Sequence, residues 1–366
     1  MCTSFLKKCS VFFGGLTFLV ITAFGGENEL PSVLLRDAPP LRFPGVKLPN
    51  YEKPVTDCNS PAHWDGGMIY LFNSANHPWR SFGPEIFHLG ESSPVQYDNS
   101  INGGRWIEAT CRAPDGTLYG WYHNEPGGLF PERKDIKQSL TAPRIGALKS
   151  NDNGATWHDL GLIIETPPDS ANPDTENFYF AGGNGDFSVI ADAQYEYVYF
   201  FISTYPKETS EQGVSVARMK FADRDNPAGK VWKGRLGKWD EPGIGGRVTP
   251  IFPATTDWHR RDANAFWGPS IHWNTHLQQY VILLNRAKDK DWTQEGIYVT
   301  FNHALDDPTG WSPPLKILEG GRWYPQVIGM DASAQETDKK AGKMARFFMS
   351  GESFREILFL QPGEKP

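Results

Sequence analysis

The sequence lacks a basic excess, because 36 Lys and Arg stand against 43 Asp and Glu and the formal net charge is −7. A domain that binds nucleic-acid phosphates needs a basic surface, so we expect no nucleic-acid partner. The sequence also lacks a Gly-x-Ser-x-Gly elbow, a phosphate-binding loop, a His-Glu-x-x-His motif and a dinucleotide fingerprint. No function of those four motif classes is therefore indicated.

Cysteine is scarce, with four in 366 residues, and no spacing among them suggests a zinc site. Cys2 and Cys9 lie in the N-terminal segment, which leaves Cys58 and Cys111. In an oxidising compartment these two thiols form a disulfide if their strands are neighbours. The alternative is a pair of buried free thiols, and the sequence does not decide between the two.

Long hydrophobic runs are absent except at residues 11–24, which follow Lys7 and Lys8. Ala23 and Gly25 are the small residues expected before a signal-peptidase cut. We therefore predict a signal peptide over residues 1–25, and a secreted or periplasmic protein without membrane contact after cleavage. An uncleaved anchor is the alternative, although the run is short for a membrane-spanning helix.

No segment of useful length has a helical period, whereas 37 Gly, 29 Pro and 13% aromatic residues are present. Such a composition suits many short strands joined by turns, with aromatic side chains packed between layers. Residues 26–55 are rich in Pro and have no clear period. We predict an N-terminal arm there, laid over the domain that follows.

One pattern recurs five times after this arm: a strand, a turn with Asp or Asn, and a second apolar strand. The turn residues are Asp65, Asp115, Asp192, Asn274 and Asp331. Their separations, from 50 to 82 residues, fit four-stranded propeller blades with insertions. We predict an all-β fold, a single five-bladed β-propeller of four-stranded antiparallel blades over residues 56–362. A pair of β-sandwiches is the alternative.

A further signal lies at residues 150–157, Ser-Asn-Asp-Asn-Gly-Ala-Thr-Trp, which match the Asp-box pattern Ser-x-Asp-x-Gly-x-Thr-Trp. The Asp and Gly shape a hairpin turn, and the Trp packs between strands. Asp boxes of this kind resemble those of sialidases and other propellers. They lie at the outer edge of a blade, so this octet indicates a fold and not a catalytic site.

Acidic residues stand at comparable places in three repeats, where the first strand of each blade lines the central channel. They are Asp57, Glu108 and Asp186. Glycoside hydrolysis needs two carboxyl groups, and a third tunes their pKa values by like-charge repulsion. We predict that these three acids are catalytic. The alternatives are a turn cap for Asp57, a buried strand position for Glu108 and the end of a Gly-rich turn for Asp186.

A second set of residues is predicted to bind substrate around these acids: Arg105, His123, Glu125, Asn264, Trp267 and Arg322. His123 and Glu125 end a strand, where they either face the pocket or belong to an ordinary loop. Asn264 and Trp267 enter the fourth blade, where Trp is either a sugar platform or a core residue. The two Arg enter the second and fifth blades, as cations of the channel mouth or as partners of the acids.

The repeat plan over roughly residues 56–362 resembles the five-bladed propeller glycosidases of the arabinanase, β-xylosidase and invertase type. Those families place an Asp, a second Asp and a Glu on the first three blades, whereas this chain has Asp, Glu and Asp. The resemblance implies a glycoside hydrolase acting on a poly- or oligosaccharide. A non-catalytic carbohydrate-binding propeller, a sialidase-like enzyme and a lyase are the alternatives.

The implied partner is a carbohydrate, and we expect a monomer that requires no cofactor. A calcium or sodium ion on the propeller axis is compatible with the fold, but the sequence assigns no ligands to it.

Overall fold

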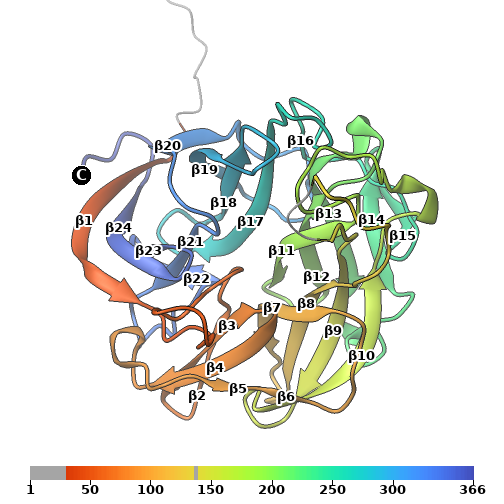
Figure 1. The fold of residues 1–366 in the computed structure, drawn as a ribbon. Helices are drawn as coiled ribbons and strands as arrows, with labels where there is room; N and C mark the ends of the chain where they lie inside the picture. The colour runs from red at the N-terminus through yellow and green to blue at the C-terminus, as the bar shows by residue number, and fades with distance from the viewer. Residues whose placement is uncertain (1–29, 136–138) are drawn as a thin grey trace, which may run out of the picture.

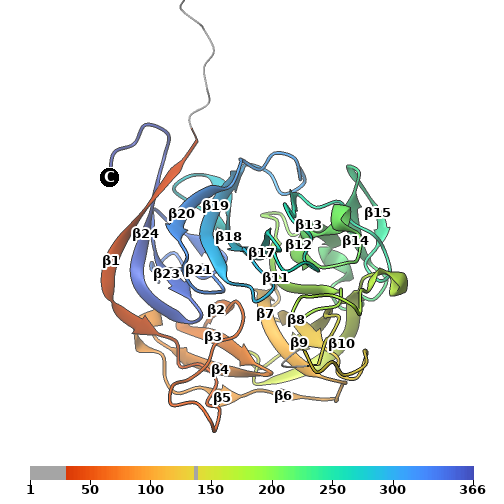
Figure 2. The ribbon, with the colours of Figure 1, turned by 45° about the horizontal axis from the view of Figure 1, so that its top comes forward.

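The computed structural model describes residues 30–135 and 139–366. Its strands form five separate, mainly antiparallel sheets arranged in a ring, as Figures 1 and 2 show. The predicted all-β, five-bladed propeller is therefore confirmed. The predicted signal peptide lies outside the described residues, so export stays a prediction. No helix among the residues described has the length and apolar character needed to cross a membrane.

The first three blades follow one another along the chain. Blade 1 consists of β2 (Ala62–Asp65), β3 (Met68–Ala75), β4 (His77–Gly83) and β5 (Ser93–Pro94). Blade 2 consists of β7 (Gly104–Arg112), β8 (Leu118–Glu125), β9 (Arg144–Ser150), β10 (Thr156–Ile164) and β6 (Gln96–Tyr97). Blade 3 consists of β11 (Asn184–Ala191), β12 (Tyr197–Thr204), β13 (Gly213–Lys220), β14 (Val231–Arg235), β15 (Lys238–Pro242) and β16 (Phe252–Pro253).

The last two blades complete the ring. Blade 4 consists of β17 (Ala265–Asn274), β18 (Gln279–Ala287), β19 (Gln294–Asn302), β20 (Leu315–Glu319) and β22 (Lys340–Ala341). Blade 5 consists of β21 (Gln326–Gly329), β23 (Met344–Met349), β24 (Glu352–Leu360) and β1 (Ser32–Arg42). Within residues 30–135 and 139–366, the helical segments are four short 3₁₀ turns: η1 (Ile86–His88), η2 (Pro168–Ser170), η3 (Thr209–Glu211) and η4 (Phe221–Asp223). Blades 2, 3 and 4 thus carry extra edge strands beyond the expected four.

The ring is closed by β1, which pairs antiparallel with β24 from Ser32 to Arg42. The propeller therefore begins at Ser32, earlier than the boundary predicted at residue 56, and part of the expected arm is a blade strand. Pro39 and Pro40 obscure the strand in the sequence. Because Pro lacks an N–H, a strand tolerates it at a sheet edge or an irregularity, and the register of β1 shifts between Asp37 and Leu41.

The turn at residues 150–157 lies between β9 and β10 of blade 2 and packs against blade 1. Asp152 accepts hydrogen bonds from the Thr156 N–H (2.9 Å) and hydroxyl (2.7 Å). Trp157 is buried and meets the ring of Phe72, on β3, edge to face at a centroid distance of 5.7 Å. Gly154 has a φ of +76° in this turn, and a Cβ there would lie 2.3 Å from the Phe72 ring.

We expect Gly154→Ala to destabilise the protein by about 3 kcal/mol, because it combines left-handed strain with overlap on Phe72. Gly229→Ala is the matched control, since Gly229 has a φ of +72° and no heavy atom within 4 Å of the added Cβ. Its expected cost is about 1 kcal/mol, for the backbone alone. Denaturant unfolding measures both, and equal losses would contradict the overlap.

Candidate active site

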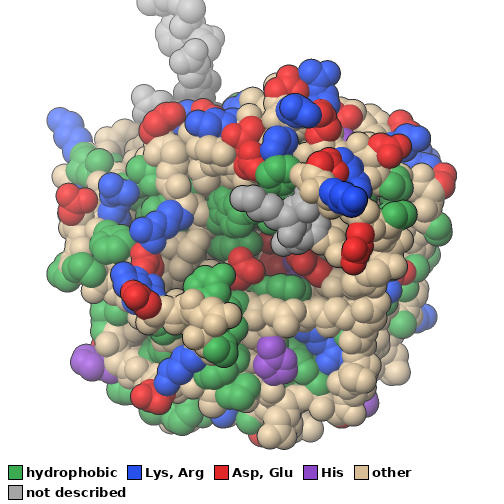
Figure 3. Space-filling view, in the orientation of Figure 1, with side chains coloured by type: hydrophobic (Ala, Val, Ile, Leu, Met, Phe, Trp, Pro, Cys, Tyr) green, Lys and Arg blue, Asp and Glu red, His purple; other side chains and the backbone are tan. Residues whose placement is uncertain are grey.

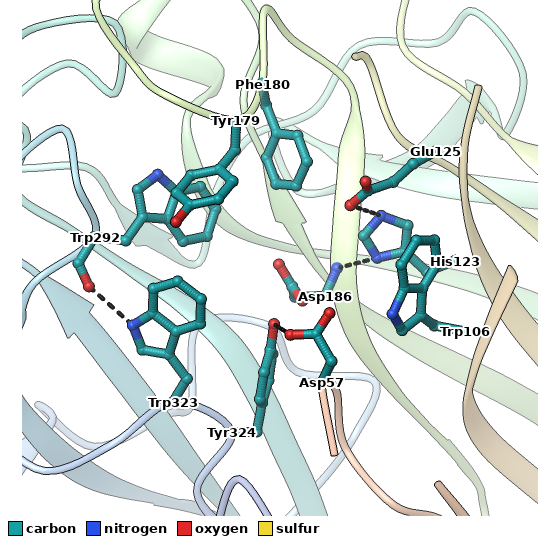
Figure 4. Close-up of a pocket in the computed structure, with 10 residues that line it drawn as sticks. All are labelled: Asp57, Trp106, His123, Glu125, Tyr179, Phe180, Asp186, Trp292, Trp323 and Tyr324. Carbon is teal, nitrogen blue, oxygen red and sulfur yellow. Dashed lines mark hydrogen bonds and ion pairs between the residues drawn. The ribbon is translucent and has the colours of Figure 1, made fainter. Parts of the chain in front are cut away.

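A pocket with a volume of about 170 Å³ opens where the first strands of the blades begin. Figure 3 shows acidic side chains in the central hollow of this face, between hydrophobic ones. Figure 4 shows the lining, which combines carboxylates with aromatic rings. The lining residues are Asp57, Trp106, His123, Glu125, Tyr179, Phe180, Asp186, Trp292, Trp323 and Tyr324.

Asp57 precedes β2 and is held by its N–H, which donates to the Ser74 carbonyl over 2.8 Å. The hydroxyl of Tyr324 lies 3.5 Å from Asp57 Oδ1. Burial, together with the neighbouring Glu125 carboxylate, raises the pKa of Asp57 to about 7, although a hydrogen bond from the Trp106 indole opposes the shift. Asp57 thus titrates in the neutral range, as a catalytic acid or base does.

Glu108 is an extra residue in β7, because the pairing with β8 shifts register between Ile107 and Ala109. Such a bulge turns a side chain out of the strand's normal alternation. Glu108 is 1% exposed and does not line the pocket. Its Oε2 accepts a hydrogen bond from the Phe187 N–H (2.7 Å), and its Oε1 lies 3.1 Å from His123 Nδ1. Burial raises the pKa of this carboxyl group.

His123 lies between two acids, with Nδ1 toward Glu108 and Nε2 3.3 Å from Glu125 Oε1. Burial alone would lower its pKa, but the hydrogen bonds to Glu108 and Glu125 raise it well above the usual value. The imidazolium thus formed offsets part of the negative charge of the site.

Asp186 occupies the equivalent place in blade 3, where β11 shifts register between Gly185 and Phe187. Its carboxylate accepts a hydrogen bond from the Tyr205 hydroxyl over 3.2 Å and faces the pocket, as Figure 4 shows. Burial and the nearby Glu108 carboxylate raise the pKa of Asp186 well above its usual range. The same bulge in two adjacent blades therefore brings two acids together at the channel mouth.

Three pocket residues have left-handed backbone: Asp186 (φ +37°), Trp292 (φ +59°) and Tyr324 (φ +59°). Such conformations are costly for residues other than Gly and cluster at functional sites. The aromatic wall is also tied together, because the Trp323 indole N–H donates to the Trp292 carbonyl over 2.9 Å. The wall is thus held in place by the backbone around it.

Four residues that the sequence predicts as substrate contacts lie outside this pocket. Arg105 is buried against Asp159 (2.8 Å) and Tyr97, which makes it a structural ion pair. Asn264 accepts a hydrogen bond from Arg286 Nε over 2.8 Å. Trp267 is fully buried behind Trp292. Arg322 forms an ion pair with Glu352. None of these four residues belongs to the lining of the pocket.

The sequence predictions included none of the six Trp, Tyr and Phe residues of the described lining, namely Trp106, Tyr179, Phe180, Trp292, Trp323 and Tyr324. The two predicted Arg residues are sequence neighbours of three of these side chains, since Trp106 follows Arg105, and Trp323 and Tyr324 follow Arg322. Nothing in the sequence marks Trp292, which stands between β18 and β19.

The two cysteines among the described residues are free thiols, with Cys58 buried and Cys111 partly buried.

Glu108, His123 and Asp186 each offer one ligand atom, and these atoms lie within 4.8 Å of one another. The calcium or sodium ion expected on the propeller axis stays a prediction. Calcium takes six to eight oxygen ligands, whereas this group offers an imidazole nitrogen beside two carboxylates. Among the described residues, Nδ1 of His123 lies 3.1 Å from Glu108 Oε1 and 3.3 Å from the Asp186 N–H, so His123 links the two acids.

No family model matches the chain, and no curated protein does. Among solved structures, the α-L-arabinanase of Cellvibrio cellulosa in complex with arabinohexaose aligns with a TM-score of 0.50 and 12% identity, over 83% of this chain and 91% of that chain. An arabinanase of Bacillus subtilis aligns with a TM-score of 0.46 and 12% identity, over 83% and 93% of the two chains. An exo-β-1,3-galactanase of Phanerochaete chrysosporium aligns with a TM-score of 0.48 and 9% identity, over 87% of this chain and 64% of that chain.

The first of these likenesses concerns the fold: the chain is a five-bladed β-propeller and shares its fold with that arabinanase. At these identities the comparison speaks for the fold alone, so its activity has to be argued from the pocket.

Proposed function

We propose that this protein is a glycoside hydrolase that uses Asp57 and Asp186 as its two reacting carboxyl groups. The observation that carries the proposal is that both line one aromatic-walled pocket and both have a raised pKa. Hydrolysis of a glycosidic bond requires one carboxyl group that is protonated and a second that is ionised. Sugars also stack their C–H faces on aromatic rings, which suits the walls of this pocket.

Asp186 is assigned as the general acid because it shares its surroundings with Glu108. Two carboxyl groups this close, with one oxygen of each within 4.8 Å, retain a proton between them. Glu108 is enclosed, so Asp186 is the member that delivers the proton to the leaving oxygen. Asp57 is the base, because the hydrogen bond from the Trp106 indole favours its charged form.

The substrate is proposed to be a neutral sugar at the end of a chain. Asp57, Glu125 and Asp186 line the pocket, and His123 is the single cationic side chain among the described lining residues. An anionic sugar would be repelled there, which disfavours a sialidase-like activity. The volume of about 170 Å³ lies below the roughly 300–1,000 Å³ of pockets for drug-sized ligands. A site of this size suits one sugar ring.

The test is product release from a panel of neutral, amino and acidic oligosaccharides. We expect single sugars to be released from the end of a neutral chain. We also expect kcat/KM to fall as the pH drops below about 7, because Asp57 must be ionised to act as a base. Glycan binding without product would support the non-catalytic alternative and contradict the proposal. A preference for acidic chains would contradict the substrate assignment.

A further inference from the structure

A second cavity lies at the end of the channel opposite to the pocket of Figure 4, where the first strands of the blades end. Its volume is about 550 Å³, and all five blades contribute to it. We call it the lower cavity; its lining includes Trp64, Thr110, Asp192, Trp273, Lys339 and Lys340. None of its lining residues lines the catalytic pocket.

The walls of the lower cavity are aromatic. Trp273 meets Tyr280 at a ring distance of 4.8 Å, and both line the cavity. Trp64 is held by its indole N–H, which donates to the Glu336 carbonyl over 2.8 Å. Tyr195 is 41% exposed at the rim. Fixed, partly exposed rings of this kind provide stacking surfaces for a sugar.

The charge of the lower cavity is opposite to that of the catalytic pocket. Three cations line it, Arg112, Lys339 and Lys340, against the single acid Asp192. The Asp192 carboxylate is engaged in its own turn, where it accepts hydrogen bonds from the N–H groups of Glu196 (2.8 Å) and Tyr197 (2.9 Å). Arg112 and Lys339 also form ion pairs, with Asp65 and Asp338 outside the lining, so Lys340 is the cation that no acid balances among the described residues.

The two lysines differ in their partners. Lys339 Nζ donates to Ser188 Oγ over 2.7 Å and lies 3.1 Å from Asp338 Oδ2. Lys340 Nζ donates to the Ala334 carbonyl over 2.7 Å, and among the described residues it forms no ion pair. A Lys ammonium has three N–H donors, so Lys340 has donors left for an anionic ligand.

Two buried side chains in the lining have polar atoms without a hydrogen-bond partner. They are Nδ1 of His63, which is 5% exposed, and Oγ1 of Thr110, which is 4% exposed. Burial lowers the pKa of His63 to about 4, so its ring is neutral and can donate or accept. Buried polar atoms are nearly always paired, and unpaired ones in a cavity indicate a site for a bound partner or water.

We propose that the lower cavity binds an anionic saccharide, a sugar residue that carries a carboxylate. The aromatic side chains stack on the ring, Lys340 pairs with the carboxylate, and the unpaired His63 and Thr110 atoms meet hydroxyl groups. This site is separate from the proposed hydrolysis of a neutral sugar, and it gives the protein a second contact with a polysaccharide of mixed charge.

The experiment is isothermal titration calorimetry of the protein with Asp186→Asn, which is expected to slow turnover about a thousandfold, using digalacturonate, neutral galactobiose and inorganic phosphate as probes. We expect saturable binding of digalacturonate that weakens with added salt. We expect Lys340→Gln and Trp273→Ala each to weaken it about tenfold or more. Lys207→Gln, an exposed lysine outside both cavities, is the matched control and leaves binding unchanged.

Three results would overturn the proposal: no binding of digalacturonate, equal binding of galactobiose, or binding of phosphate that matches digalacturonate. Lys340→Gln keeps the test decisive if Trp273→Ala fails to fold, because Lys340 contacts a single carbonyl oxygen. Binding that requires an unaltered Asp57 in the catalytic pocket would also contradict a separate site. Because digalacturonate is not the proposed neutral substrate and the variant turns over slowly, the outcome does not depend on whether hydrolysis occurs.

Discussion

Asp186→Asn is expected to reduce kcat/KM on an unactivated glycoside by about a thousandfold, within the range for loss of a general acid. The amide keeps the size of the side chain and can still accept the Tyr205 hydrogen bond, but it has no proton to deliver. We expect the loss to be much smaller on an aryl glycoside with a strongly acidic phenol, since that leaving group departs without protonation. Steady-state kinetics on the two substrates measure the difference.

Asp338→Asn is the matched control for this experiment. Asp338 is also a buried Asp with a pKa raised by burial, but it lies outside the pocket and accepts a hydrogen bond from the Ala62 N–H over 2.9 Å. We expect its kcat/KM to stay close to that of the unaltered protein. If the kcat/KM of Asp57→Asn, and not that of Asp186→Asn, recovers on the aryl glycoside, the assignment of acid and base is reversed.

Asp57→Asn is expected to lose about a thousandfold in kcat/KM on both substrates, because the base is needed whichever group leaves. The same change is expected to stabilise the fold at pH 8. The pKa of Asp57 is about 7 in the folded protein, against 3.8 for an Asp side chain free in water. Between these values the native state holds a proton that the unfolded chain has released, so the free energy of unfolding falls as the pH rises.

The size of this stabilisation follows from the shift. One pKa unit corresponds to about 1.4 kcal/mol, and because Asp57 faces an open pocket we expect a gain of about 2 kcal/mol at pH 8. The gain should fade as the pH falls from 7 to 4. Thermal unfolding of both proteins at several pH values measures it, and a gain that does not depend on pH would contradict the titration of Asp57.

Asp152→Asn provides a control of opposite sign. Burial alone would raise the pKa of Asp152, but the Thr156 N–H and hydroxyl lower it. A group with a lowered pKa stabilises the fold above its unfolded pKa, and this contribution is lost as the pH falls through the folded pKa. We expect Asp152→Asn to be less stable than the unaltered protein at pH 7, with a difference that shrinks at acidic pH.

The blade plan was predictable because each blade is a local unit. Five turns with Asp or Asn, each followed by an apolar strand, mark the repeats in the sequence. Asp57, Glu108 and Asp186 were found in the same way, since equivalent places in a repeat meet at the channel. The closing strand β1 was not predicted, because its partner β24 lies at the far end of the chain and Pro39 and Pro40 hide its alternation.

The chemistry around the three acids could not be predicted from local signals. Glu108 and Asp186 turn inward through bulges, and a bulge is a property of the pairing with the next strand. Arg105 stands one residue before a pocket residue, yet its side chain pairs with Asp159 on β10. Successive residues of a strand point to opposite faces. Within a strand, a residue next to a pocket residue in the sequence therefore points away from the pocket.

The sequence by itself thus determined the all-β repeat, because short-range periodicity and turn chemistry encode it. The same repeat singled out Asp57, Glu108 and Asp186 as the acids near the channel in the first three blades. The tertiary structure decided that Asp57 and Asp186 face the pocket while Glu108 lies behind them with His123, and that loop residues such as Trp292 complete the wall. These outcomes depend on burial and on distances between blades, and the pKa of a carboxyl group follows from those distances and not from its position in the chain.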